Sequence, residues 1–151
     1  MAGDRDAAAA PRTLTVYTDG GARGNPGPAA IGVVVADARD RLLREHAESI
    51  GEATNNEAEY RALIKGLEIA AGFTRGPVTC VSDSELVTRQ MRGEYRVREP
   101  RLVPLYKEAR ARARAFEAVE FRSLPRLTGR LRRADTLVND ALDEAGGSGR
   151  G

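Results

Sequence analysis

The chain has very few of the residues that build disulfides and zinc sites. Its 151 residues contain one cysteine, one histidine and no tryptophan. A single cysteine cannot form an internal disulfide, and Cys80 lies in an apolar stretch, which predicts a buried structural thiol. Structural zinc centres are built from clusters of cysteine and histidine, so the composition excludes this class of metal site.

Long apolar runs are also missing. No stretch approaches the ~20 residues that a membrane-spanning helix needs. The first residues, MAGDRDAAAAP, contain acids and lack an apolar segment, so they do not form a secretory signal. We therefore expect a cytoplasmic protein with no membrane partner. The length suits one domain, for which we expect a monomer.

Lysine is scarce, and most of the positive charge comes from arginine. The formal net charge is +2, and two of the 24 basic residues are lysines. Five arginines and no acid lie between residues 121 and 134. Arginine binds phosphate through planar, bidentate donors, so Arg126, Arg130 and Arg132 are candidate contacts to nucleic acid. A solvated, arginine-rich face is the alternative interpretation.

Turn residues and hydrophobic periodicity predict five strands and four helices. We expect strands at 13–19, 30–36, 41–50, 78–83 and 119–124, and helices at 55–73, 84–91, 101–116 and 133–145. Residues 1–12 and 146–151 are expected to be disordered tails around one domain, residues 13–145. Short connections make the first three strands an antiparallel meander, and a right-handed crossover makes the first and fourth strands parallel neighbours. The fold class is therefore α/β, a mixed five-stranded sheet flanked by helices.

Two aspartates come at the ends of expected strands. Asp19 closes TLTVYTD, and Asp83 closes VTCVSD. If these strands are neighbours, the two carboxylates lie within about 5 Å of each other sideways. Ligands bind outside the carboxyl ends of strands in such sheets. Two aspartates this close repel each other unless a cation or a proton stands between them.

The two long helices that flank these strands add further acids. Thr54 and Glu57 form a capping-box pattern at a helix start. At ~100° per residue, Glu59 shares a stripe with small and apolar residues and points at the sheet, whereas Glu57 lies over Arg61, where a surface ion pair is expected. In the last helix, Asp135 lies on the flank of the apolar side, and the other acids are less well placed.

Asp19, Glu59, Asp83 and Asp135 are therefore the expected metal-binding and catalytic residues. Ligand sets that contain only oxygen favour Mg²⁺ or Mn²⁺ over zinc. Sites of this kind hold two ions about 4 Å apart and perform in-line displacement at phosphorus.

Four segments carry a resemblance to a known family. They are TDGGARGNPGPAAIG at 18–32, ATNNEAEYRAL at 53–63, SDS at 82–84 and RRADTLVNDALD at 132–143. Together they resemble type 1 ribonuclease H over nearly the whole domain.

The resemblance implies a ribonuclease H-like fold and an endoribonuclease that cuts the RNA strand of RNA–DNA hybrids by two-metal-ion catalysis. It assigns the family's metal-binding carboxylates to the same four positions. It also implies that Asn25, Thr54, Asn55 and Asn56 contact the hybrid. Short polar side chains at a helix start can reach the 2′-hydroxyls of a shallow minor groove.

The sequence departs from the family pattern in two places. Many members have a histidine in the loop before the fourth acid, but here that loop reads SLPRLTGRLRRAD. The one histidine, His46, falls in the expected third strand, too early in the chain to take that role. The basic insertion that some members use to grip the hybrid is also missing. These departures concern turnover and affinity rather than the type of reaction.

Other functions on the same fold stay open at this point. A non-catalytic nucleic-acid-binding module would be indicated by the loss of an acid, and none of the four is lost. Another nuclease or phosphoryl-transfer enzyme would lack the NPG turn and the TNN helix start. A purely structural domain would not bury several acids, because unpaired buried charge is costly.

Overall fold

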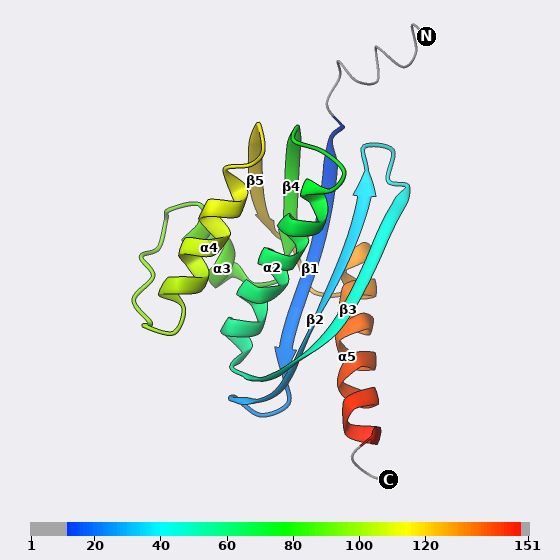
Figure 1. The fold of residues 1–151 in the computed structure, drawn as a ribbon, viewed down its shortest axis with the longest axis vertical. Helices are drawn as coiled ribbons and strands as arrows, with labels where there is room; N and C mark the ends of the chain where they lie inside the picture. The colour runs from blue at the N-terminus through cyan, green and yellow to red at the C-terminus, as the bar shows by residue number, and fades with distance from the viewer. Residues whose placement is uncertain (1–11, 149–151) are drawn as a thin grey trace, which may run out of the picture.

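The computed structural model describes residues 12–148 (Figure 1). Within these residues, nine elements follow one another in the order expected from the sequence. They are β1 Leu14–Ala22, β2 Gly27–Asp37, β3 Leu42–Ala53, α2 Asn55–Ala71, β4 Pro77–Ser82, α3 Glu85–Met91, α4 Val103–Ala113, β5 Ala118–Ser123 and α5 Arg130–Ser148. Among the described residues, no helix is long and apolar enough to cross a membrane.

The five strands form one mixed sheet in the order β3-β2-β1-β4-β5. β1, β2 and β3 pair antiparallel, whereas β4 pairs parallel with both β1 and β5. The predicted meander and the predicted parallel pairing of the first and fourth strands are therefore confirmed. The predicted fold class, a mixed five-stranded sheet flanked by helices, is confirmed as well.

Helices cover the two faces of the sheet unequally. α2 packs on β1 and β2, with α4 against its outer side, whereas α5 lies on the opposite face over β2, β1 and β3. Both crossings depend on a glycine. A Cβ on Gly66 of α2 would lie 2.7 Å from Val16 Cγ1, and a Cβ on Gly32 of β2 would lie 2.5 Å from the Ala134 carbonyl oxygen of α5. Glycine therefore lets each helix sit close to the central strands.

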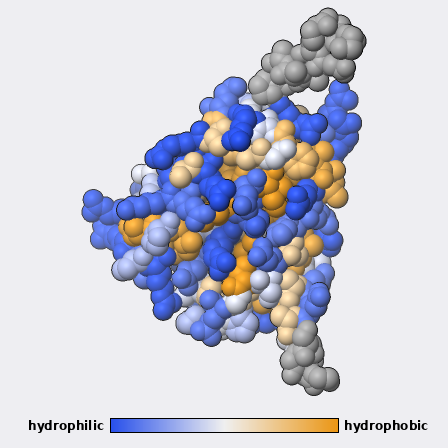
Figure 2. Space-filling model, viewed as in Figure 1, coloured by the Kyte–Doolittle hydropathy of each residue, from blue (hydrophilic) through white to orange (hydrophobic). Residues whose placement is uncertain are grey.

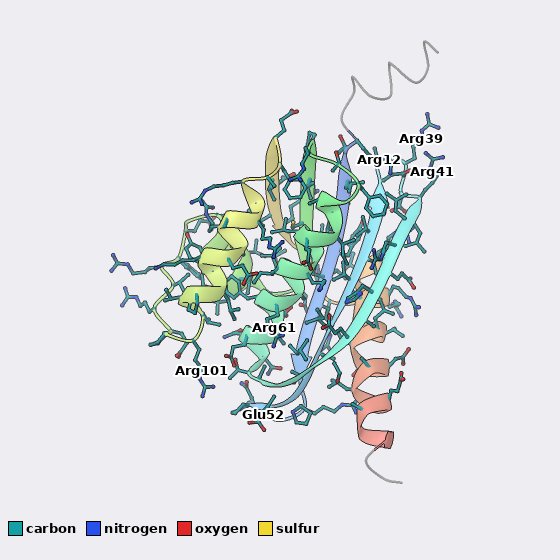
Figure 3. The ribbon with its side chains drawn as sticks, in the orientation of Figure 1. Arg12, Arg39, Arg41, Glu52, Arg61 and Arg101 are labelled. Atoms are coloured by element: carbon teal, nitrogen blue, oxygen red, sulfur yellow. The ribbon has the colours of Figure 1, made fainter. Side chains whose placement is uncertain are left out.

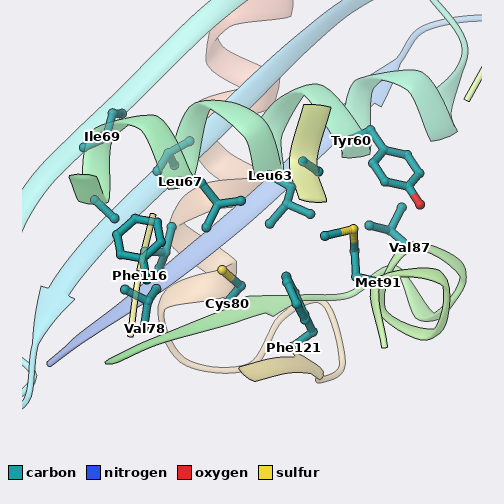
Figure 4. Packing of buried hydrophobic residues seen from close by; sticks show 14 of the residues in the cluster. Tyr60, Leu63, Leu67, Ile69, Val78, Cys80, Val87, Met91, Phe116 and Phe121 are labelled. Carbon is teal, nitrogen blue, oxygen red and sulfur yellow. The ribbon is translucent and has the colours of Figure 1, made fainter. Parts of the chain in front are cut away.

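The main core lies between the sheet and the helices α2, α3 and α4 (Figure 4). The residues labelled there are aliphatic, aromatic or sulfur-containing and come from helices and strands alike. Cys80 lies among them and is buried, as predicted, and burial raises the pKa of its thiol to about 12. Hydrophilic residues cover most of the outer face on this side (Figure 2).

Several boundaries differ from the sequence predictions. β1 does not end at Asp19 but continues to Ala22, because Gly20 and Ala22 pair with Ile31 and Ala29 of β2. The first helical residue of α5 is Arg130 instead of residue 133, and the helix runs to Ser148. Buried Leu131 explains the early start, since these three extra residues, most of one helical turn, place its side chain in the core.

The predicted tails fall largely outside the described residues, which exclude 1–11 and 149–151. Within the predicted first tail, Arg12 is described, and its carbonyl oxygen accepts a 2.6 Å hydrogen bond from Thr74 Oγ1. Within the predicted second tail, residues 146–148 are the last turn of α5. Residue 12 and residues 146–148 thus have described structure, and the predicted domain limits of 13–145 stay a prediction.

Candidate active site

Three carboxylates from three different elements meet beside the end of β4. One oxygen each of Asp19 in β1, Glu59 in α2 and Asp83 after β4 lie within 4.8 Å of one another. β1 and β4 pair in parallel with Tyr17 opposite Val81, so Asp19 and Asp83, each two residues further on, lie at the same end of the sheet. The structure thus brings together three of the four acids that the sequence singled out.

Glu59 is positioned by the start of α2 and by β1. The helix begins with the predicted capping box, in which Thr54 Oγ1 accepts from the Glu57 N–H and Glu57 Oε1 accepts from the Thr54 N–H. This fixes the helical phase, which turns Glu59 toward the sheet. The Gly20 N–H then donates a 3.0 Å hydrogen bond to Glu59 Oε1.

Glu57 keeps its capping role but not its expected ion pair. Arg61 donates to the Ile50 carbonyl oxygen instead, and the nearest cation to Glu57 Oε1 is Arg101 Nη1 at 3.9 Å. Figure 3 shows Arg61 and Arg101 reaching out on the face that carries α2. The helical phase was predicted correctly, but the partner was wrong, because Arg61 reaches the strand before its own helix.

The acids at this site are electrostatically frustrated. Burial, followed by the charges of Asp83 and Asp135, raises the pKa of Asp19 from 3.8 to about 7. Burial and the charges of Asp19 and Asp83 likewise raise the pKa of Glu59 well above its usual value. In water-like surroundings both groups would ionise at lower pH. The cluster therefore disfavours its own ionisation unless a cation is supplied.

The donor set fits a hard divalent cation. Asp83 Oδ1 is buried and has no hydrogen-bond partner within residues 12–148. A buried carboxylate oxygen without a partner is rare, because leaving it unsatisfied costs free energy. All the converging ligand atoms are carboxylate oxygens, which Mg²⁺ and Mn²⁺ prefer. The residues present thus match the kind of ion that the sequence predicted.

Asp135 joins the site from the other face of the sheet. It lies in the first turns of α5, is half-buried, and lines the same cleft as the three clustered acids. Its charge contributes to the raised pKa of Asp19. It is not among the three acids that lie within 4.8 Å of one another. Asp135 therefore belongs to the cleft, at a greater distance from its centre.

The polar residues at the start of α2 form a linked rim beside the cleft. The Ala22 N–H donates to Asn55 Oδ1 and the Asn55 N–H donates to Asn25 Oδ1, both over 2.9 Å. Asn55 lines the carboxylate cleft. Asn25, Thr54 and Asn56 line a neighbouring hollow. The side-chain oxygens of Asn25 and Asn55 thus both accept hydrogen bonds from backbone N–H groups, and their NH₂ groups take no part in these two bonds.

The three predicted arginine contacts are placed very differently. Arg126 lines the carboxylate cleft, and its charge lowers the pKa of Asp19. Arg130 instead bonds to Asp40, both at the side-chain Oδ1 (3.0 Å) and at the carbonyl oxygen (2.6 Å). Asp40 lies in the turn between β2 and β3. In Figure 3, Arg39 and Arg41 mark this turn, which lies far from Glu52 at the other end of β3. Arg132 is exposed on the first turn of α5.

His46 lies in β3, as expected, and is not among the cleft residues. Its Nε2 is 2.9 Å from Glu48 Oε1 on the same strand. Nothing in this geometry supports a role for His46 in the site, in agreement with the sequence interpretation.

Sequence reasoning missed three residues at these hollows. Arg23 and Asn139 line the carboxylate cleft, and Arg101 lines the neighbouring hollow with Asn25 and Thr54. Asn139 could have been found, because it lies one helical turn after Asp135 on the same face. Arg23 lies in the glycine-rich turn and forms a 2.7 Å ion pair with Asp143 of α5. No local sequence pattern indicates this long-range contact. Arg101 comes from a loop whose course only the fold reveals.

Comparisons with known proteins agree with this geometry. A family model described as "Reverse transcriptase-like" matches residues 17–141. The "Bifunctional protein Rv2228c" of Mycobacterium tuberculosis is 44% identical over 133 residues, which are 87% of this chain and 36% of that protein. "Ribonuclease HI" of Halobacterium salinarum is 42% identical over 129 residues, 85% of this chain and 64% of that protein. This chain thus spans less than two thirds of the length of either relative.

Among solved structures, LC11-RNase H1 in complex with an RNA/DNA hybrid superposes with a TM-score of 0.82. It is 44% identical, and the match covers 87% of this chain and 98% of that one. The family match extends across most of the chain and includes all four candidate acids. The chain therefore belongs to the type 1 ribonuclease H family.

Proposed function

We propose that this chain is a metal-dependent endoribonuclease that hydrolyses the RNA strand of RNA–DNA hybrids. The observation that supports this most directly is the cluster of Asp19, Glu59 and Asp83, with an unpartnered buried oxygen on Asp83 and a strongly raised pKa on Asp19. The relatives named above as ribonuclease HI, and the relative solved with a hybrid, support the substrate class.

The same residues define the proposed cofactor. Asp19, Glu59 and Asp83 would hold Mg²⁺ or Mn²⁺, and Asp135 would complete the site for a second ion. Bound divalent ions of this kind activate a water molecule and neutralise charge that develops at phosphorus. The ion identity, two-ion occupancy, a monomeric state and a cytoplasmic location all stay predictions.

The chain's own groups would orient the substrate. Arg126 is the cation that lines the carboxylate cleft from the loop before α5, and a guanidinium binds phosphate but stays protonated at working pH. The amides of Asn25, Asn55 and Asn56, which line the cleft and the neighbouring hollow, would contact the 2′-hydroxyls that a minor groove offers. Since DNA lacks that hydroxyl, these contacts would favour the RNA strand of a hybrid.

A gel assay with end-labelled substrates tests this function. With Mg²⁺ or Mn²⁺, the RNA strand of a hybrid should be cut, while DNA duplex is spared and RNA duplex and single-stranded RNA are cut far less. Glu59→Gln should be inactive, because it removes one clustered carboxylate, whereas Glu57→Gln keeps the capping side chain and should stay active. Equal cutting of DNA duplex would indicate a general nuclease, and binding without cutting would indicate a non-catalytic module.

Arg126→Ala is expected to weaken hybrid binding and to flatten its salt dependence. A phosphate contact releases condensed counterions, so losing one should reduce the slope of log K against log salt by about 1. Arg130→Ala is the matched control, because Arg130 is bonded to Asp40 and should leave that slope unchanged. Binding measured by fluorescence anisotropy between low and moderate salt distinguishes the two. Identical slopes for Arg126→Ala and the parent would favour the solvated-face interpretation for this loop.

A further inference from the structure

One buried hydrogen bond connects two helices that position acids of the cleft. Tyr60 Oη in α2 donates to Gln90 Oε1 in α3 over 2.6 Å. Tyr60 is fully buried, and Gln90 is 4% exposed. Within residues 12–148, this is the one hydrogen bond that joins α2 to α3 directly. Figure 4 shows Tyr60 beside Val87 and Met91, two apolar residues of α3.

At the α2 end, the bond is adjacent to a cleft acid. Tyr60 directly follows Glu59, so the two residues share one helical turn and move together. Their side chains differ by ~100° around the helix, which turns Glu59 toward the cleft and Tyr60 toward α3. Glu59 is also held from β1 by the Gly20 N–H.

At the α3 end, a second cleft acid directly precedes the helix. Asp83 lies between Ser82, the last residue of β4, and Ser84, the N-cap of α3. The Ser84 N–H donates to Ser82 Oγ, and Ser84 Oγ accepts from the Val87 N–H. Asp83 Oδ1 has no hydrogen-bond partner in the described chain, and the backbone of Asp83 directly precedes the N-cap of α3.

We infer that the Tyr60–Gln90 hydrogen bond is a positioning contact that sets the separation of Asp83 from Glu59 for cation binding. α3 has only seven residues, and the apolar packing of Val87 and Met91 is non-directional. Its C-terminal end is held by two hydrogen bonds, from Arg110 Nη1 to the Met91 carbonyl oxygen and from Arg92 Nε to the Phe121 carbonyl oxygen. Neither of these bonds reaches α2, so the distance between α3 and α2 depends on the Tyr60–Gln90 bond. A hydrogen bond fixes both distance and direction. This inference rests on the proposed function, because the cation is the one that function requires. Tyr60 and Gln90 themselves touch neither cation nor substrate.

Calorimetric titration of Mg²⁺ into the substrate-free protein tests this role without any measure of activity. Tyr60→Phe keeps the ring and removes the hydroxyl. We expect the dissociation constant for Mg²⁺ to rise about threefold to tenfold, somewhat less than the 10–100-fold effect of removing a partner bonded directly to a metal ligand. The Mg²⁺ concentration for half-maximal cleavage should rise by the same factor, with KM for the hybrid unchanged.

Two further variants separate positioning from general loosening. Thr88→Val removes a buried hydroxyl of α3 whose bond runs within the helix region, to the Ser84 carbonyl oxygen, and should leave Mg²⁺ affinity unchanged. Tyr60→Phe alone leaves Gln90 Oε1 buried without its partner, which should lower the melting temperature. Combining Tyr60→Phe with Gln90→Leu removes both partners, so the melting temperature should return toward that of the parent. The Mg²⁺ affinity should stay weak in this double variant. It also keeps the test possible if the single variant folds poorly.

The outcomes are distinct. Parent-like Mg²⁺ affinity in both Tyr60 variants would overturn the inference and leave the proposed function standing, provided the parent binds Mg²⁺ and cleaves hybrid. An equal loss in Thr88→Val would also overturn it, because the effect would then come from any loosening of α3. A parent protein that neither binds Mg²⁺ nor cleaves hybrid would overturn the proposed function itself, and the inference with it.

Discussion

Asp19→Asn is expected to abolish cleavage and to make the metal-free protein more stable at pH 8. The carboxyl pKa is raised from 3.8 to about 7 by burial and by the neighbouring acids. Ionised Asp19 therefore opposes folding, and a neutral amide of the same shape removes that cost. The difference of about three pKa units corresponds to at most about 4 kcal/mol in unfolding free energy.

The direction of the pH dependence follows from linkage. The folded-state pKa of this acid lies above its unfolded value, so the folded state binds the proton more tightly. The parent is then relatively most stable below about pH 4 and loses this contribution as pH rises from about 4 to about 7. Asp19→Asn lacks this titration, so its advantage should be large at pH 8 and vanish near pH 4.

Urea unfolding of both proteins in EDTA, at pH 4 and at pH 8, measures this difference. Asp140→Asn is the matched control, because Asp140 is exposed on α5 and should alter neither cleavage nor this pH dependence. Added Mg²⁺ should stabilise the parent by mass action but not Asp19→Asn. A parent-like cleavage rate in Asp19→Asn would contradict the assigned site, and unchanged stability at pH 8 would contradict the frustrated cluster.

Gly20→Ala is expected to disrupt the site, whereas its neighbour Gly21→Ala should be nearly neutral. A Cβ on Gly20 would lie 2.3 Å from the Ala58 carbonyl oxygen and 2.8 Å from the Glu59 nitrogen. Both contacts are with backbone, so β1 and α2 must move apart. A Cβ on Gly21 would meet only Val138 Cγ1, at an ordinary 3.8 Å.

The expected effects of Gly20→Ala are large in both stability and rate. Overpacking of this kind costs about 1–3 kcal/mol in unfolding free energy. Separating the strand from the helix also stretches the bond from the Gly20 N–H to Glu59 and moves Asp19 away from that glutamate. A misplacement of about 1 Å in a catalytic site can cost roughly a hundredfold in rate. Gly21→Ala should stay within about 0.5 kcal/mol of the parent, as is usual for substitutions without such contacts.

Thermal unfolding and single-turnover cleavage of the two alanine variants provide the measurement. If Gly20→Ala and Gly21→Ala behaved alike, the close approach of β1 to α2 would have no part in forming the site. The neighbouring positions make the comparison strict, since both substitutions add one methyl group to the same strand.

The local chemistry of the sequence determined which face of α2 turns inward. The Thr54 capping box sets where the helix begins, and the 3.6-residue period then places Glu59 toward the sheet without knowledge of the rest of the chain. The crossover rule similarly predicted that Asp19 and Asp83 would be neighbours, because a helical connection makes β1 and β4 parallel. Both inferences use short-range patterns whose geometry hardly depends on context.

Only the tertiary structure decided which arginines face the cleft and how far the elements extend. Arg130 bonds to Asp40, ninety residues away in sequence, while Arg126, in the loop just before α5, lines the cleft. β1 continues past Asp19 because β2 supplies hydrogen-bond partners for Gly20 and Ala22. Long, flexible side chains and strand ends take their partners from whatever the folded chain places nearby, and those long-range contacts leave no periodic trace in the sequence.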